Sequence, residues 1–121
     1  MRLKGRVISG LRKGAYFVGL EQYRKFFSKI LNGSIFCGTL NIELHDKTWR
    51  EIPLKIYLPG KNLSPIYYTK AKIFSEEVVL IRPAKSKHAE NVMEVVACCN
   101  LRQKYSLEDG DEVEIIVDER R

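Results

Sequence analysis

The chain has 121 residues, of which 45% are hydrophobic and 30% charged, a composition typical of one folded domain and not of a disordered segment. No apolar run approaches the roughly 20 residues that a membrane span needs. The residues after Met1 lack the apolar stretch of a secretion signal, so we expect a cytoplasmic protein without a membrane partner. Cys37, Cys98 and Cys99 form neither a disulfide framework nor a zinc motif, and we expect them to be small buried residues.

The net charge of +6 is concentrated at one end of the chain. Residues 1–31 carry eight basic side chains and one acidic one, a net +7, whereas the remainder is close to neutral at −1. A local basic field favours an anionic partner. Nucleic acid, a nucleotide and a phosphorylated metabolite all fit this charge.

The first part of the chain predicts a strand, a glycine-containing loop and one helix. A short strand over 2–8, interrupted at Gly5, is followed by a loop over 9–14 and a second extended piece over 15–20. The hydrophobic period then changes to that of an amphipathic helix, which predicts a helix over 21–32 that ends at Asn32 and Gly33. The apolar stripe of this helix consists of Tyr23, Phe26, Phe27, Ile30 and Leu31.

The chain after residue 33 is mostly β in pattern. Short alternating or fully apolar segments separated by turn residues are typical of a small closed barrel, and the absence of repeated βα units argues against a doubly wound sheet. We therefore predict a mainly β fold, a small barrel forming one domain over residues 1–121. The expected elements are strands over 38–44, 52–58, 66–74, 77–83, 92–99 and 112–117, and a short helical turn over 101–107.

The strand predicted over 38–44 has an unusual polar face. Leu40, Ile42 and Leu44 point one way, and Thr39, Asn41 and Glu43 point the other. Oxygen ligands on one rigid face can hold Mg²⁺ when a substrate phosphate completes the shell. The commoner alternative for this segment alone is the solvated face of a half-exposed strand.

Residues 9–17 form a second candidate segment. Gly10 and Gly14 would let the backbone approach a phosphate group closely, and Arg12 and Lys13 between them add positive charge. The order of residues is not that of a Walker A loop. A basic surface turn is an equally good interpretation of this segment by itself.

Two further polar groups occur late in the chain. Glu94 lies within an apolar strand pattern, so its carboxylate either faces solvent or points into a pocket where it could accept a hydrogen bond from a substrate hydroxyl. Asn100 and Arg102 open the predicted helical turn and could bind a phosphate or a base edge, or simply be a helix cap and a surface arginine. His45 and His88 have no ligand-spaced partner and are interpreted as loop residues.

Together these segments resemble the archaeal CTP-dependent riboflavin kinases, and the resemblance runs over nearly the whole chain. No single motif is decisive, but their order and spacing are fairly specific. The matching pieces are Gly5-Arg6-Val7, Ser9-Gly10-Leu11, Gly14-Ala15-Tyr16-Phe17, Tyr23, Phe27-Ser28-Lys29-Ile30-Leu31, Gly38-Thr39-Leu40-Asn41, Pro83, Glu94, Leu101-Arg102 and residues 107–111.

The resemblance implies a six-stranded barrel of the cradle-loop type and an enzyme that transfers the γ-phosphate of CTP to riboflavin, giving FMN and CDP. We expect this enzyme to be a monomer. It implies one Mg²⁺ ion on Thr39 and Asn41, and flavin binding by Ser86 and Glu94, with Glu94 orienting or deprotonating the 5′-hydroxyl. No nucleic acid partner is expected. The nucleotide-binding residues that it implies are Gly10, Leu11, Arg12, Lys13, Gly14, Ala15, Cys99, Asn100, Leu101 and Arg102.

The chain departs from the family pattern in three places. Ser86 stands where the family often has Thr, Cys98-Cys99 replaces a segment often written with Pro and Met, and the segment over 44–66 is shorter. Any role of Cys99 would therefore rest on its backbone. Some relatives carry a DNA-binding domain in front of the barrel, for which we expect no room here.

Two alternatives from other classes stay open. One is a non-catalytic barrel that binds nucleic acid through the basic residues 1–31, and the other is a flavin-binding domain without kinase activity.

Overall fold

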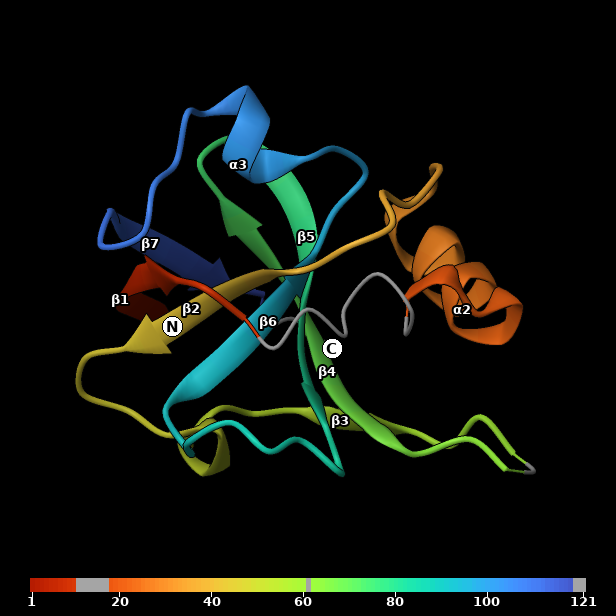
Figure 1. The fold of residues 1–121 in the computed structure, drawn as a ribbon. Helices are drawn as coiled ribbons and strands as arrows, with labels where there is room; N and C mark the ends of the chain where they lie inside the picture. The colour runs from red at the N-terminus through yellow and green to blue at the C-terminus, as the bar shows by residue number, and fades with distance from the viewer. Residues whose placement is uncertain (11–17, 61, 119–121) are drawn as a thin grey trace.

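The computed structural model describes residues 1–10, 18–60 and 62–118. Its strands are β1 (Arg2–Ile8), β2 (Leu40–Leu44), β3 (Lys55–Tyr57), β4 (Ile66–Ile73), β5 (Glu76–Pro83), β6 (Val92–Val96) and β7 (Glu112–Val117). Six of them run antiparallel in the order β4-β5-β6-β2-β1-β7, and β7 pairs with β4 to close the ring (Figure 1). The strand β3 is attached outside the ring, to β4. This arrangement confirms the predicted mainly β, six-stranded barrel.

The barrel interior is aliphatic, because successive side chains along each strand alternate between the two faces of the sheet. On β5, for example, Val78 and Leu80 belong to the interior cluster, whereas Val79 and Ile81 belong to a second cluster on the outer face. All six strands of the ring contribute to the interior. Its members include Leu3, Val7, Leu40, Ile42, Leu44, Ala71, Ile73, Val78, Leu80, Met93, Val95, Val113, Ile115 and Val117.

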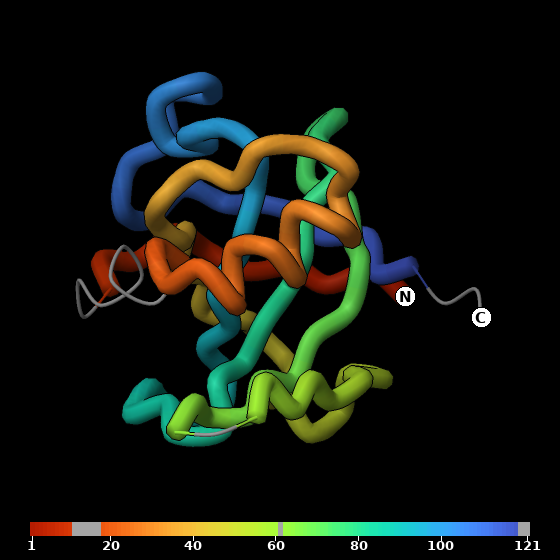
Figure 2. The backbone as a smooth tube through the Cα atoms, turned by 90° about the vertical axis from the view of Figure 1, so that its right-hand side faces the viewer, coloured from red at the N-terminus to blue at the C-terminus, as the bar shows by residue number. Residues whose placement is uncertain are grey.

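The helix α2 (Glu21–Leu31) covers part of the outer face, where it lies across the barrel (Figure 2). Its buried residues Tyr23 and Phe27 pack in the outer cluster with Ile66, Val79 and Ile81. The helix ends where Asn32 adopts a left-handed conformation at φ 54°, as the sequence predicts. Within the described part of the chain, no helix is both long enough and apolar enough to span a membrane.

Several predicted elements differ from the observed ones. The strand predicted over 52–58 is only β3, because the 3₁₀ helix η1 (Trp49–Glu51) and Pro53 precede it, and proline has no N–H to donate to a strand ladder. The strands predicted over 38–44 and 92–99 are shorter, as β2 begins at Leu40 and β6 ends at Val96. The extended piece predicted over 15–20 is wrong at residues 18 and 19, which are helical, while residues 15–17 lie outside the described part of the chain.

The expectation that the cysteines are buried is also wrong. Cys37 and Cys98 are exposed, and Cys99 is partly exposed. The reason is that all three lie in the loops that flank β2 and β6, outside the strands themselves.

Candidate functional site

The polar face of β2 lies on the outside of the barrel, next to β6. Leu40 and Ile42 fill the interior, so Asn41 between them points outward. The strand register places Asn41 opposite Glu94 of β6 on one side and opposite Ile8 of β1 on the other. Two side chains that are 53 positions apart in the sequence are therefore direct cross-strand neighbours.

Thr39 joins this pair through a hydrogen bond. Its Oγ1 donates to Glu94 Oε1 at 2.8 Å. Asn41 is only 9% exposed, and its Oδ1 accepts no hydrogen bond from the described residues. A buried carbonyl oxygen without a donor is unfavourable unless a ligand or water satisfies it. The cluster thus presents an amide oxygen, a hydroxyl oxygen and a carboxylate on one side of the sheet, a set of hard donors that suits Mg²⁺ and fits the predicted metal ligands Thr39 and Asn41.

Gly10 lies directly against the side chain of Asn41. A Cβ atom at position 10 would lie 2.1 Å from Asn41 Nδ2 and 2.7 Å from Asn41 Cγ, so only glycine brings the backbone this close. Gly10 is the first residue of the predicted phosphate-binding segment. The next five, Leu11, Arg12, Lys13, Gly14 and Ala15, lie outside the described part of the chain.

A pocket of about 220 Å³ opens beside this cluster. Thr39 belongs to both, so the predicted metal side and the predicted nucleotide side meet at this residue. Asn100 caps the short helix α3 (Leu101–Lys104), since its Oδ1 accepts a hydrogen bond from the Gln103 N–H at 3.1 Å. The pocket is lined by Phe36, Gly38, Thr39, Leu40, Val95, Ala97, Cys99, Asn100, Leu101 and Arg102.

Arg102 is held by the protein, which sequence reasoning did not anticipate. Its Nη2 donates to Asp109 Oδ1 at 3.0 Å and makes a longer contact of 3.4 Å with the carbonyl of Ile8. The other carboxylate oxygen of Asp109 accepts a hydrogen bond from Ser9. These bonds from Ser9 and Arg102 lower the pKa of Asp109. Asp109 therefore links the residue before Gly10 to the wall of the pocket, whereas the sequence indicated only a tight turn at this position.

The position of α3 is also fixed by a second carboxylate. Glu76, at the start of β5, accepts hydrogen bonds from Lys104 Nζ at 2.6 Å and from the Tyr105 hydroxyl at 2.7 Å. These two bonds lower the pKa of Glu76, with the bond from Lys104 contributing most. The helix that carries Arg102 is thereby tied to the turn between β4 and β5.

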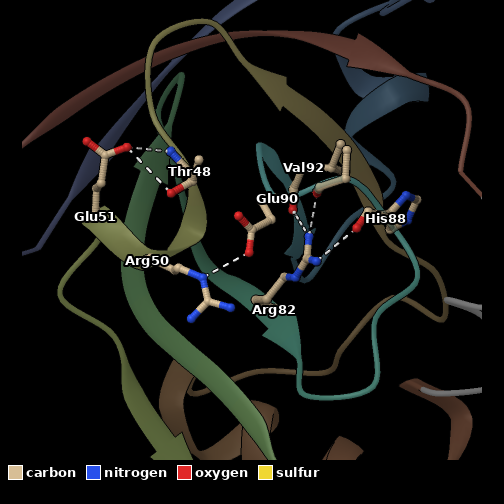
Figure 3. Close-up of polar contacts among 8 residues, drawn as sticks. Thr48, Arg50, Glu51, Arg82, His88, Glu90 and Val92 are labelled. Carbon is tan, nitrogen blue, oxygen red and sulfur yellow. Dashed lines mark hydrogen bonds and ion pairs between the residues drawn. The ribbon is translucent and has the colours of Figure 1, made fainter.

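The predicted flavin residue Ser86 lies in the loop between β5 and β6. Its Oγ accepts a hydrogen bond from the His88 N–H at 3.2 Å. The loop is organised by Arg82, a 7% exposed residue whose guanidinium donates to the carbonyls of His88, Ala89 and Val92 at 2.7–2.9 Å (Figure 3). Burial lowers the pKa of Arg82.

Sequence reasoning missed this arginine, since its only signal is a lone charge directly after the apolar run Val78-Val79-Leu80-Ile81. Of the two predicted flavin residues, Ser86 is hydrogen-bonded to His88 and Glu94 to Thr39, and no hydrogen bond of the described residues joins Ser86 to Glu94. The described residues also contain no group of three His, Cys, Asp or Glu side chains that could hold a metal ion.

The chain is similar to curated proteins over most of its length. Residues 7–117 match the family model of the CTP-dependent riboflavin kinase domain, which carries the description of a domain of unknown function, DUF120. A protein named riboflavin kinase from Methanococcus vannielii is 36% identical over 129 residues, which cover 96% of this chain and 97% of the relative. Another of the same name, from Pyrobaculum aerophilum, is 35% identical over 128 residues, covering 95% of this chain and 60% of the relative. The chain thus spans about 60% of the length of the Pyrobaculum relatives.

Proposed function

The chain belongs to the CTP-dependent riboflavin kinase family, and we propose that it transfers the γ-phosphate of CTP to the 5′-hydroxyl of riboflavin, giving FMN and CDP. The observation that carries this proposal is the outward-facing cluster of Thr39, Asn41 and Glu94, which lies against Gly10 and beside a pocket. A phosphate chain held at this place would have oxygen ligands for its metal on one side and the backbone of Gly10 on the other.

Thr39 and Asn41 are the residues that would hold Mg²⁺. When bound, the ion neutralises charge on the phosphate oxygens during transfer. Asn41 would contribute Oδ1, which is buried and has no donor among the described residues. Thr39 would contribute its hydroxyl oxygen, whose hydrogen is already directed at Glu94 and whose lone pairs therefore point elsewhere.

Glu94 is the residue that would receive the flavin hydroxyl. Its Oε1 is used by Thr39, and the hydrogen-bonding capacity of its other oxygen can orient the hydroxyl or accept its proton. Ser86, in the loop that Arg82 holds, would bind the flavin from the same side. In-line transfer needs the acceptor hydroxyl and the phosphate chain on opposite sides of the transferred group. This need is met if Glu94 binds the flavin hydroxyl while Gly10 and the pocket bind the nucleotide.

The proposed working form is a monomer in the cytoplasm. The two rival functions make different predictions. A nucleic-acid-binding barrel would bind duplex or RNA with a steep salt dependence through the basic residues 1–31. A flavin-binding domain would bind riboflavin without forming a nucleotide-dependent product. Neither rival accounts for the buried oxygen of Asn41, to which no described residue donates a hydrogen bond.

The test is FMN formation from riboflavin by the purified chain, with CTP or ATP and with or without Mg²⁺. We expect FMN with CTP and Mg²⁺. For Asn41→Ala we expect the rate to fall roughly 10²-fold or more, because the variant lacks a ligand of the Mg²⁺ ion that would neutralise charge on the transferred phosphoryl group. Asn91→Ala is the matched control, since that amide donates to the Leu44 carbonyl at the far end of β2 and to no other described residue. No FMN from folded protein with any nucleotide would overturn the proposal, and equal activity of both variants would overturn the metal assignment.

A further inference from the structure

Phe36 is an exposed aromatic residue at the wall of the pocket. Its side chain is 40% exposed, although large apolar side chains are normally buried. It lines the same pocket as Thr39, Asn100 and Arg102. Other aromatic rings of the described chain pack against one another, such as Phe26 on Tyr57 at 3.7 Å between centroids. Phe36 has no such ring partner among the described residues, so one face of an aromatic ring stays available at the pocket.

The backbone around Phe36 is built to keep the ring in this position. The Phe36 N–H donates to the Ala97 carbonyl at 2.9 Å, which ties the segment before β2 to the segment after β6. Gly38 lies under the ring: a Cβ atom there would approach Phe36 Cε2 to 3.1 Å. Gly38 also has φ +152°, a conformation that side-chain-bearing residues rarely adopt. A glycine at position 38 thus permits both the turn and the close approach of the ring.

The chemistry of the pocket fits a ligand with one flat aromatic part and one charged part. Phe36 offers a flat apolar wall, Asn100 and Arg102 offer polar groups, and Thr39 connects the pocket to the proposed metal ligands. Of the two proposed substrates, the nucleotide combines a flat base with charged phosphates and so matches both parts of the pocket. The flavin residue Ser86 does not line this pocket, which argues against the flavin ring as its occupant.

We propose that the nucleobase of the nucleotide substrate stacks on the ring of Phe36. The inference rests on the proposed function and adds the residue that receives the base. Stacking is tolerant of base identity because every base has a π face. Phe36 therefore supplies affinity for the nucleoside, and the choice of CTP over other nucleotides comes from the polar groups of the pocket.

The experiment compares CDP binding, measured by calorimetry with Mg²⁺ and without riboflavin, for the wild-type chain and for Phe36→Ala, Phe36→Leu and Phe36→Trp. For Phe36→Ala we expect a 5- to 150-fold weaker Kd, the range for the loss of one stacked base. Phe36→Leu should recover little of this loss and Phe36→Trp most of it, because tryptophan restores a flat ring. Ile116→Ala is the control, as Ile116 is 43% exposed on β7 and does not line the pocket.

Kinetics give a second readout. KM for CTP should rise in Phe36→Ala while KM for riboflavin and the ratio of CTP to ATP use stay unchanged. Wild-type Kd in folded Phe36→Ala, full rescue by leucine, or a rise in KM for riboflavin alone would overturn the inference while leaving the kinase proposal intact. A wild-type chain that binds no CDP and forms no FMN would overturn both.

Discussion

Replacing Gly10 by alanine tests whether the close approach of the Gly10 backbone to Asn41 matters for activity. The added Cβ would lie 2.1 Å from Asn41 Nδ2 and 3.0 Å from Asn41 Oδ1. Favourable contacts between heavy atoms lie near 3.5–4.0 Å, so the amide has to retreat by more than roughly 1 Å. Asn41 is paired on both sides, with Ile8 and Glu94, so the retreat is made by its side chain and not by the strand.

The expected consequence is larger for activity than for stability. A misplacement of about 1 Å at a reacting site costs about 10²-fold in rate, whereas overpacking typically costs about 1–3 kcal/mol in the free energy of unfolding. We therefore expect kcat/KM for FMN formation to fall about 10²-fold and the Mg²⁺ concentration for half-maximal rate to rise. Both are measured by chromatographic product assays over a Mg²⁺ titration, with urea unfolding for stability.

Gly19→Ala is the control for this substitution, because a Cβ there has no described heavy atom within 4 Å. We expect its rate and Mg²⁺ dependence to match those of the wild-type chain. A folded Gly10→Ala variant with wild-type activity and wild-type Mg²⁺ dependence would refute the reasoning, since it would mean that the Asn41 amide can move without consequence.

Three further substitutions test the contacts that support the site. Arg82→Met removes the guanidinium that donates to the carbonyls of His88, Ala89 and Val92, although the Ala89 carbonyl keeps the Val92 N–H as a donor. We expect the free energy of unfolding to fall by about 1–3 kcal/mol and KM for riboflavin to rise, with KM for CTP unchanged. An unchanged KM for riboflavin would contradict the role of the 84–91 loop. Asp109→Asn weakens the link to Ser9 and should raise KM for CTP. The pKa of Asp109 is lowered from 3.8, so the contribution of its carboxylate to stability is complete above that pH and is lost as the pH falls through the folded-state pKa. The stabilities of the wild type and the variant should therefore converge in acid. Glu76→Gln should lower the free energy of unfolding by about 1 kcal/mol at pH 7. The pKa of Glu76 is lowered from its ordinary value of 4.5, so the difference in urea midpoint between wild type and variant should vanish as the pH falls well below 4.5. A difference that persists in acid would show that the charge of Glu76 is not its cause.

Local periodicity explains why some elements could be predicted from the sequence. The spacing of Tyr23, Phe26 and Phe27 is incompatible with a strand, and the observed α2 over Glu21–Leu31 agrees with the predicted 21–32. The alternation in β2 also predicted which of its residues fill the barrel and which face outward. In these cases the structure depends on residues that are close together in the sequence, so the hydrophobic pattern predicts it.

Long-range pairing explains what could not be predicted. Nothing near Thr39 in the sequence indicates that β2 pairs with β6, so the bond from Thr39 to Glu94, 55 positions away, could not be predicted from the pattern. The resemblance assigned the two residues to different ligands and did not join them. The bond between Ser9 and Asp109 spans 100 positions. The three carbonyl partners of Arg82 depend on how one loop folds back, a feature that has no periodic signal.

The double pairing of β7 has a consequence for how the chain is made. β7 follows the other strands along the chain, yet it pairs with both β1 and β4 and completes the ring. At about 5–20 residues per second on the ribosome, the emerging chain has two open strand edges until β7 appears. Asp109, which lies three residues before the start of β7, binds Ser9 next to Gly10. Barrel closure and assembly of the nucleotide side should therefore occur together, and a chain truncated before β7 should aggregate and lack the site.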